Sequence, residues 1–238
     1  MDLKELASGV DPSKHWYYRS KALLLSGLAD HSIDSVADVG AGSMYFSREI
    51  ARRSEVHTIW AIDSNYSEEH REKIGLSEIV ALRTPTEATF KTPLWMFMDV
   101  IEHVEDSHEF LRQYVDPVAS GTRFFVTVPA FQFMWSQHDE YLGHFRRYSK
   151  SSLVELLESV GLRVERVGYY YCSLFPLAWM QRKIFHPTVR KSKNSSLMTN
   201  QSRLLNTIFY KVMKLEFMIF RGYSRLPGLT VVCTAIKR

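Results

Sequence analysis

Short apolar runs alternate with longer amphipathic segments along most of this chain. A run of consecutive apolar residues bounded by glycine, proline or polar positions is typical of a buried strand, whereas apolar residues three and four positions apart are typical of a helix. Seven strands are predicted in this way, over residues 35–40, 57–63, 77–84, 93–100, 121–129, 163–171 and 228–238. Helices are predicted over residues 12–29, 45–54, 106–115, 149–162 and 203–222.

The alternation of strands and helices predicts an α/β fold with a parallel sheet that is covered by helices on both faces. In such sheets a ligand binds beyond the carboxyl ends of the strands. Gly40, Asp63, Asp99 and Pro129 each stand at the carboxyl end of a predicted strand. We therefore expect these four residues to converge around one site.

The organisation of the chain is expected to be a single domain over residues 1–238, with an N-terminal helical cap over 1–30. A helical, basic and aromatic insertion is expected over 172–226, before the last strand. Between positions 166 and 215 there are nine Lys or Arg residues and no Asp or Glu. Such a region suits a membrane surface, a phosphorylated substrate or nucleic acid, and it is equally compatible with a helical insertion whose charges face water.

The 45% hydrophobic and 24% charged content is ordinary for a globular protein, and the longest uncharged apolar run is too short to cross a bilayer. The N-terminus lacks an apolar core of signal-peptide length, so we expect a cytoplasmic protein that can also contact a membrane peripherally. Cys172 and Cys233 have no metal-binding spacing and are expected to be buried, reduced thiols.

The turn after the first predicted strand reads Asp38-Val-Gly40-Ala-Gly42. Two glycines allow a tight turn and a close approach of the backbone to a ligand. A dinucleotide loop usually has a third glycine that leaves room for a pyrophosphate, but Met44 stands near that position. The turn therefore favours a ligand without phosphate that has an amino-acid end and a ribose, whose vicinal hydroxyls Asp63 is placed to bind.

Three stretches of the chain, "DVGAGSMYF", "AIDSN" and "MDVIEHVED", together resemble motifs of the class I S-adenosylmethionine-dependent methyltransferases, in the ubiquinone-biosynthesis-like branch. The stretch "VPAFQFMWSQHDEYLGHFRRYSKSSLVELLESVGL" resembles a bacterial subgroup of that superfamily, as do "HWYYRSKA" and "LPGLTVVCTAIKR". The resemblance implies a Rossmann-like, seven-stranded, mostly parallel sheet whose last strand is antiparallel. It also implies S-adenosyl-L-methionine as cofactor and S-adenosyl-L-homocysteine as product.

The same resemblance implies a set of cofactor contacts. The glycine turn would line the methionine part, Asp63 would hold the ribose, and residues 98–100 would close over the sulfonium. The implied residues are Arg19, Asp38, Gly40, Ala41, Gly42, Asp63, Ser64, Thr84, Met98, Asp99, Val100 and His103.

Two positions depart from the family pattern. Met44 replaces the usual third glycine, which should reshape the turn without blocking a phosphate-free ligand. Thr84 stands where the family often has an acidic residue near the adenine amine, a role that Thr86 or Glu87 would have to fill.

The segment after the fifth predicted strand, residues 135–149, is rich in groups that could act on a substrate. Methyl transfer to a hydroxyl needs a base, and histidine has an unperturbed pKa near neutrality. His and Asp side chains are metal ligands, but the spacing of His138, Asp139 and His144 matches no metal motif, and no metal is expected. An alternative role for Arg147 and Tyr148 is to fix this segment, which would form a lid over the site, to the core. The candidate catalytic residues are His138, Asp139, His144, Arg147 and Tyr148.

Taken together, these patterns predict a methyltransferase that acts on a small-molecule or on a carrier- or lipid-linked metabolite, with oxygen as the preferred acceptor. An RNA-modifying methyltransferase is one alternative, although no nucleic-acid-binding module is visible and no nucleic-acid partner is expected. A catalytically silent subunit that binds a partner is another. A nicotinamide oxidoreductase is disfavoured by the crowded glycine turn.

Overall fold

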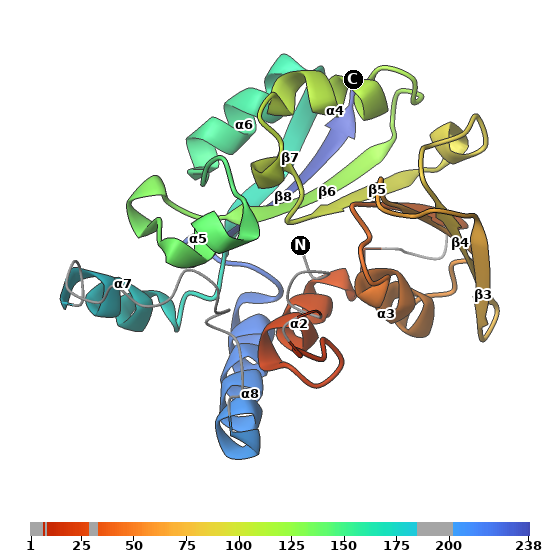
Figure 1. The fold of residues 1–238 in the computed structure, drawn as a ribbon. Helices are drawn as coiled ribbons and strands as arrows, with labels where there is room; N and C mark the ends of the chain where they lie inside the picture. Colours follow the sequence, from red (N-terminus) through yellow and green to blue (C-terminus); the bar gives the residue numbers. More distant parts are fainter. Residues whose placement is uncertain (1–6, 8, 29–32, 185–201) are drawn as a thin grey trace.

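The computed structural model describes residues 7, 9–28, 33–184 and 202–238 of the chain. Within these residues it forms one sheet of eight strands in the order β3-β4-β2-β1-β5-β6-β8-β7 (Figure 1). The strands are β1 (Ser35–Val39), β2 (Thr58–Ile62), β3 (His70–Ile74), β4 (Ser77–Leu82), β5 (Leu94–Met98), β6 (Arg123–Pro129), β7 (Leu162–Tyr170) and β8 (Thr230–Lys237).

The pairing of the strands confirms the predicted α/β architecture. Strands β4, β2, β1, β5 and β6 are parallel neighbours, whereas β8 pairs antiparallel with both β6 and β7. The sheet is therefore Rossmann-like and mostly parallel, with an antiparallel last strand, as the family resemblance implies, but it has eight strands in place of the expected seven.

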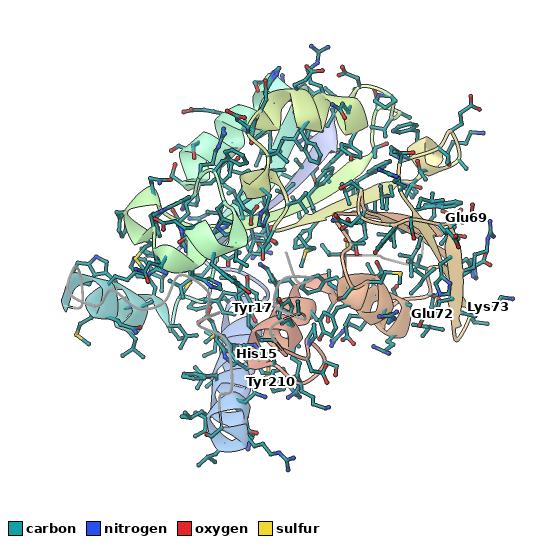
Figure 2. All side chains as sticks on the ribbon, in the orientation of Figure 1. His15, Tyr17, Glu69, Glu72, Lys73 and Tyr210 are labelled. Atoms are coloured by element: carbon teal, nitrogen blue, oxygen red, sulfur yellow. The ribbon has the colours of Figure 1, made fainter. Side chains whose placement is uncertain are left out.

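The strand β3 at one edge of the sheet was not predicted. It pairs antiparallel with β4 across a turn at Gly75, whose φ is 61°. Its sequence, HREKI, is almost wholly polar and lacks the apolar run by which strands were recognised. Glu69, Glu72 and Lys73 lie along this edge (Figure 2). Charged side chains on an edge strand discourage pairing with another chain.

Helices cover both faces of the sheet and enclose two hydrophobic cores (Figure 1). Side chains of β5 alternate between them: Leu94 and Met96 enter the core under α2, α3 and α8, while Trp95 and Phe97 enter the core under α4 and α6. The helices are α2 (Trp16–Lys21), α3 (Tyr45–Arg53), α4 (Ser107–Val115), α5 (Gln137–Leu142), α6 (Lys150–Ser159), α7 (Phe175–Ile184) and α8 (Arg203–Phe220), with short 3₁₀ helices η1 (Ala22–Leu25), η2 (Thr89–Lys91), η3 (Ile101–His103) and η4 (Gln132–Met134).

Helix ends agree with the sequence in some places and differ in others. Asp106 caps α4 by accepting a hydrogen bond from the Glu109 amide at 2.9 Å, and Ser149 caps α6 in the same manner at 3.0 Å. The single helix expected over residues 12–29 is shorter, because α2 tightens into the 3₁₀ helix η1 at Ala22.

Helices α7 and α8 lie between β7 and β8 in the sequence, and the chain leaving α8 crosses β7 closely. Tyr169 and Ser224 exchange backbone hydrogen bonds of 2.7 and 2.8 Å at this crossing. Gly168 makes the approach feasible, since a Cβ there would lie 2.5 Å from the carbonyl oxygen of Ser224.

We predict that Gly168→Ala lowers the free energy of unfolding by about 1–3 kcal/mol, because the added methyl overpacks a backbone contact that cannot yield without breaking the Tyr169–Ser224 pairing. Urea denaturation measures this change. Arg163→Ala on the same strand, where the side chain is exposed, serves as the control and should stay within about 0.5 kcal/mol of the wild type. A Gly168→Ala protein as stable as the control would contradict the crowding.

Candidate active site

The glycine turn after β1 is held against two neighbouring strand ends. The amides of Gly40 and Ala41 donate to the carbonyl of Ile62 at 2.8 and 3.2 Å. Gly40 has φ of 69°, and a Cβ at this position would lie 2.7 Å from a methyl group of Val100. Only glycine satisfies both conditions, since other residues rarely adopt this backbone conformation.

Met44 stands at the start of α3 with a left-handed backbone, φ 61°. Its side chain packs against the core under α2 and α3, and it is not among the described residues that line the cavities below. The structure therefore does not support the expectation that this side chain crowds the ligand space.

Asp63 follows β2 and faces the glycine turn. Its Oδ2 accepts from the Gly42 amide at 2.8 Å, and its Oδ1 accepts from the Asn65 backbone amide and side chain at 2.9 and 2.8 Å. The side chain is 8% exposed, toward a cavity of about 390 Å³. The carboxylate is thus fixed at the wall of this cavity.

This first cavity lies beyond the carboxyl ends of β1, β2 and β5. Seven residues predicted to bind a cofactor line it: Gly40, Asp63, Ser64, Thr84, Asp99, Val100 and His103. It is completed by residues that sequence reasoning did not name, including Asn65, Arg83, Phe110, Gln113 and Tyr114.

The other predicted cofactor residues lie elsewhere. Asp38 is buried and accepts a hydrogen bond of 2.6 Å from the Ser47 hydroxyl, so it joins β1 to α3. Ala41 and Gly42 shape the turn, and Met98 is buried in the core under α2. The guanidinium of Arg19 lies 4.0 Å above the ring of Tyr210, in the contact between α2 and α8.

Asp99 is the residue on which the site is centred. It has φ of 56°, an unusual backbone conformation for aspartate, and its carboxylate is buried. The buried ammonium of Lys21 forms an ion pair with Oδ2, the Tyr17 hydroxyl donates to Oδ2 at 2.9 Å, and the Thr127 hydroxyl donates to Oδ1 at 3.0 Å. Burial alone would raise the pKa of Asp99, but the charge and hydrogen bonds of Lys21 lower it below its usual value.

Sequence reasoning missed both partners from the N-terminal helix. Tyr17 and Lys21 are four residues apart, so they share a face of α2, and the Lys21 ammonium also donates to the Tyr17 hydroxyl at 2.9 Å. A lysine immediately before the apolar run 22–25 was the available signal, because a charge at such a position is normally paired.

A second cavity, of about 210 Å³, lies on the other side of Asp99. Aromatic and apolar side chains form most of its wall, and Tyr17 stacks on Tyr171 there at a centroid distance of 5.4 Å. Figure 2 shows Tyr17 on α2 near the middle of the molecule. The lining residues are Trp16, Tyr17, Asp99, Glu102, Pro129, His138, Leu142, His144, Arg147, Tyr171, Ala178, Arg182, Leu229 and Thr230.

The lid over residues 135–149 is organised by Asp139, which is fully buried. Arg147 donates to both of its carboxylate oxygens, at 2.7 and 3.0 Å. His144 Nδ1 lies 2.9 Å from Oδ1, and the Ser136 amide and hydroxyl donate to Oδ2 at 2.8 and 2.9 Å. Burial opposes the charge, but these hydrogen bonds lower the pKa of Asp139, which stays ionised and holds His144 in place.

The remaining predicted catalytic residues differ in position. His138 faces the second cavity, and burial lowers its pKa to about 4, so it is uncharged at neutral pH and is a weak base there. The Tyr148 hydroxyl is buried 2.9 Å from that of Ser107, and the residue lines neither cavity. Its placement fits the alternative of pinning the lid to the core.

Glu102 is a wall residue of the second cavity to which sequence reasoning gave no role. Its side chain is 0% exposed, and neither carboxylate oxygen has a hydrogen-bond partner among the described residues. Burial, together with the nearby charge of Asp99, raises the pKa of Glu102 well above its usual value.

The two cysteines are free, as expected, and lie outside the site. Cys233 is buried and Cys172 is partly buried. Burial raises the pKa of each thiol to about 12, which makes both poor nucleophiles.

Comparison with known proteins identifies the family to which this chain belongs. A model of a family described as a methyltransferase domain matches residues 13–167 of this chain. A search of curated proteins gave no match.

Solved structures share the fold at low sequence identity. A chain of the complex containing the Haloferax volcanii Trm112 methyltransferase activator has a TM-score of 0.54 and 15% identity, over 94% of this chain and 90% of that chain. The plantazolicin methyltransferase BamL, solved with a triazolic desmethylPZN analog and SAH, has a TM-score of 0.50 and 10% identity, over 95% and 85%. The (4+2)-cyclase SpnF has a TM-score of 0.52 and 12% identity, over 93% of this chain and 81% of that chain. These likenesses concern the fold alone.

We predict that Lys21→Met lowers the free energy of unfolding by about 3–5 kcal/mol, because it leaves the Asp99 carboxylate buried without its counter-ion. The double variant Lys21→Met/Asp99→Asn should lose less than the sum of the two single variants, as measured by urea denaturation.

The control is Arg112→Met, which removes a half-exposed ion pair with Asp116 and should cost less than about 1 kcal/mol. Strictly additive losses in the Lys21 and Asp99 variants would show that the two charges do not depend on each other.

Proposed function

Because this chain belongs to the methyltransferase-domain family, we propose that its first cavity binds S-adenosyl-L-methionine and its second binds the molecule that receives the methyl group. The observation that carries this proposal is the shared wall, since Asp99 lines both cavities. A cofactor and an acceptor on the two sides of one residue would lie close enough for direct transfer. Positioning supplies much of the rate when the leaving group is already activated.

Asp63 supports a nucleoside in the first cavity. Its carboxylate is fixed by three amide donors and still faces the cavity, where it can accept hydrogen bonds from vicinal ribose hydroxyls. The rings of Phe110 and Tyr114 on the same wall suit the adenine base. That BamL, of similar fold, was solved with SAH adds support.

The second cavity favours an acceptor with an aromatic or apolar body and an anionic group. Trp16, Tyr17 and Tyr171 supply the aromatic wall. Arg182 on α7 faces the same space, its Nη1 has no hydrogen-bond partner among the described residues, and burial lowers its pKa to about 10, so it remains charged. A small-molecule or a carrier- or lipid-linked metabolite with these features is the proposed substrate class.

Oxygen is the proposed acceptor atom. The hydroxyl oxygen bonds to the methyl carbon, the carbon–sulfur bond breaks, and its electron pair remains on sulfur, which gives S-adenosyl-L-homocysteine. The hydroxyl proton must pass to a base. His144 supports this role better than His138, because its Nδ1 is held by Asp139 and its Nε2 is left without a partner beside the second cavity.

We predict that the protein binds S-adenosyl-L-methionine and S-adenosyl-L-homocysteine with sub-millimolar affinity in isothermal titration. Asp63→Ala should weaken this affinity about 10- to 100-fold, which is the worth of hydrogen bonds to a charged group. Lys73→Ala, at an exposed position of the edge strand β3, is the control and should bind like the wild type.

Absence of binding by the wild type would overturn the proposal at its first step. If binding is found, transfer of a labelled methyl group to small-molecule and lipid extracts and to tRNA separates the substrate classes. Label in the tRNA alone would favour an RNA-modifying enzyme instead.

We also propose that α7 and α8 contact an anionic membrane surface. Both helices project away from the sheet (Figure 1). An apolar stripe follows one side of α8 at helical spacing, with Leu204 and Ile219 exposed by 70% and 64%. The other members of the stripe are Ile208, Val212 and Leu215, and exposed Leu177, Trp179 and Met180 lie on α7.

The positive charge of this surface favours an anionic lipid over a neutral or cationic one. Lys211 and Lys214 are exposed on α8. The acidic residue of that helix, Glu216, is buried and accepts hydrogen bonds from the Cys172 and Ser173 amides at 2.8 and 2.7 Å. No helix in the described part of the chain is long and apolar enough to cross a bilayer, so the contact would be peripheral.

We predict that the protein sediments with vesicles of phosphatidylcholine mixed with phosphatidylglycerol, and much less with phosphatidylcholine alone. Lys211→Glu/Lys214→Glu should weaken binding about 10-fold or more, since each basic residue near an anionic surface contributes about 1 kcal/mol. The charge-matched control, Arg71→Glu/Lys73→Glu on β3, should bind normally. Binding that ignores lipid charge, or equal losses in both variants, would refute this surface.

A further inference from the structure

Three side chains that come from two separate segments meet between the cavities. Glu102 and His103 end the 3₁₀ helix η3 after β5, and His144 follows α5 in the lid. One ligand atom of each lies within 4.8 Å of the others. The lid is fixed to η3 at this point, because the Phe145 amide donates to the Glu102 carbonyl at 2.8 Å.

Glu102 is the unusual member of this group. A fully buried carboxyl group without a hydrogen-bond partner is costly, and buried acids that carry a charge are paired or coordinate a metal. Its neighbour Asp99 takes the charge of Lys21 and the hydroxyls of Tyr17 and Thr127, which leaves none of these donors for Glu102. A partner for the Glu102 oxygens would therefore have to come from outside this set of donors.

His144 likewise has a buried polar atom without a hydrogen-bond partner among the described residues. Its Nδ1 is 2.9 Å from the carboxylate of Asp139, while Nε2 is buried and has no partner among the described residues. A carboxylate that holds one ring nitrogen fixes the tautomer and points the other nitrogen's lone pair at a ligand, as in many metal-binding histidines. The ring of His103 lies edge-on to that of His144 at 4.6 Å.

We propose that Glu102, His103 and His144 bind one divalent transition-metal ion, such as Zn²⁺ or Mn²⁺. Two imidazoles and one carboxylate form a ligand set that leaves coordination positions open. Glu102 and His144 line the second cavity, while His103 lines the first. The site differs from the trio His138, Asp139 and His144, since Asp139 is already engaged by Arg147 and Ser136 and serves to orient His144.

The open positions of such an ion would face the proposed acceptor. If the proposed function holds, a hydroxyl oxygen of the acceptor coordinates the ion there, which lowers the hydroxyl pKa and lessens the need for His144 as a base. Metal binding itself requires neither the cofactor nor an acceptor, so it can be tested separately from methyl transfer.

The test uses the untagged full chain, freed of metal by a chelator and titrated with Zn²⁺ and with Mn²⁺ in the absence of S-adenosyl-L-methionine. Calorimetry and elemental analysis should find one ion per chain for at least one of the two metals. Glu102→Gln and His144→Ala should each weaken binding about 100-fold, whereas His108→Ala, which removes an exposed histidine on α4, should leave it unchanged.

Melting curves keep the test valid if a variant folds poorly. The metal should raise the melting temperature of the wild type, and it should not raise that of Glu102→Gln, which keeps the shape of the side chain. A wild type that binds neither metal, or affinity that survives both Glu102→Gln and His144→Ala, would overturn the proposal. Loss of affinity in His108→Ala equal to that in the other variants would do the same.

Discussion

A lysine ammonium and an aspartate carboxylate, both shut off from water, meet where the N-terminal helix touches the end of β5. Removing either Lys21 or Asp99 would destabilise the fold, because the other residue would be left as an unpaired buried charge. Through this pair α2 becomes part of the site rather than a cover for the sheet. Asp99 in turn forms the wall between the two cavities, so the separation of the proposed cofactor and acceptor spaces depends on the same contact.

A second charged group follows the same principle in the lid. Asp139 gathers Arg147, Ser136 and His144, which orders the segment after β6 without any strand or long helix. Between the two satisfied carboxylates lies Glu102, whose oxygens have no donor in the described part of the chain. That contrast supports the proposed ligand-binding role of Glu102, because a buried carboxyl group with no hydrogen-bond partner costs free energy on folding.

The sequence was a good guide to whatever depends on local pattern. Apolar runs located seven strands, and the strand-end rule brought Gly40, Asp63 and Asp99 to one cavity. Strand β3 was not predicted, because an edge strand can form without the apolar run that identifies a buried strand. Lys21 and Tyr17 were not predicted to be site residues. Their partner Asp99 is 78 and 82 positions away in the sequence, and no local pattern reveals a contact over that separation. Met44 packs against the core and lines neither cavity, and its left-handed backbone is a feature that the sequence does not disclose.

The order of strands also bears on how the chain folds. Strand β7 reaches the rest of the sheet only through β8, which lies beyond α7 and α8 in the sequence. On the ribosome, β7 can therefore join the sheet only after β8 emerges, whereas β1 to β6 can assemble earlier. Leu229 and Thr230, at the start of β8, line the second cavity. The second cavity is consequently completed only after the last strand has been synthesised.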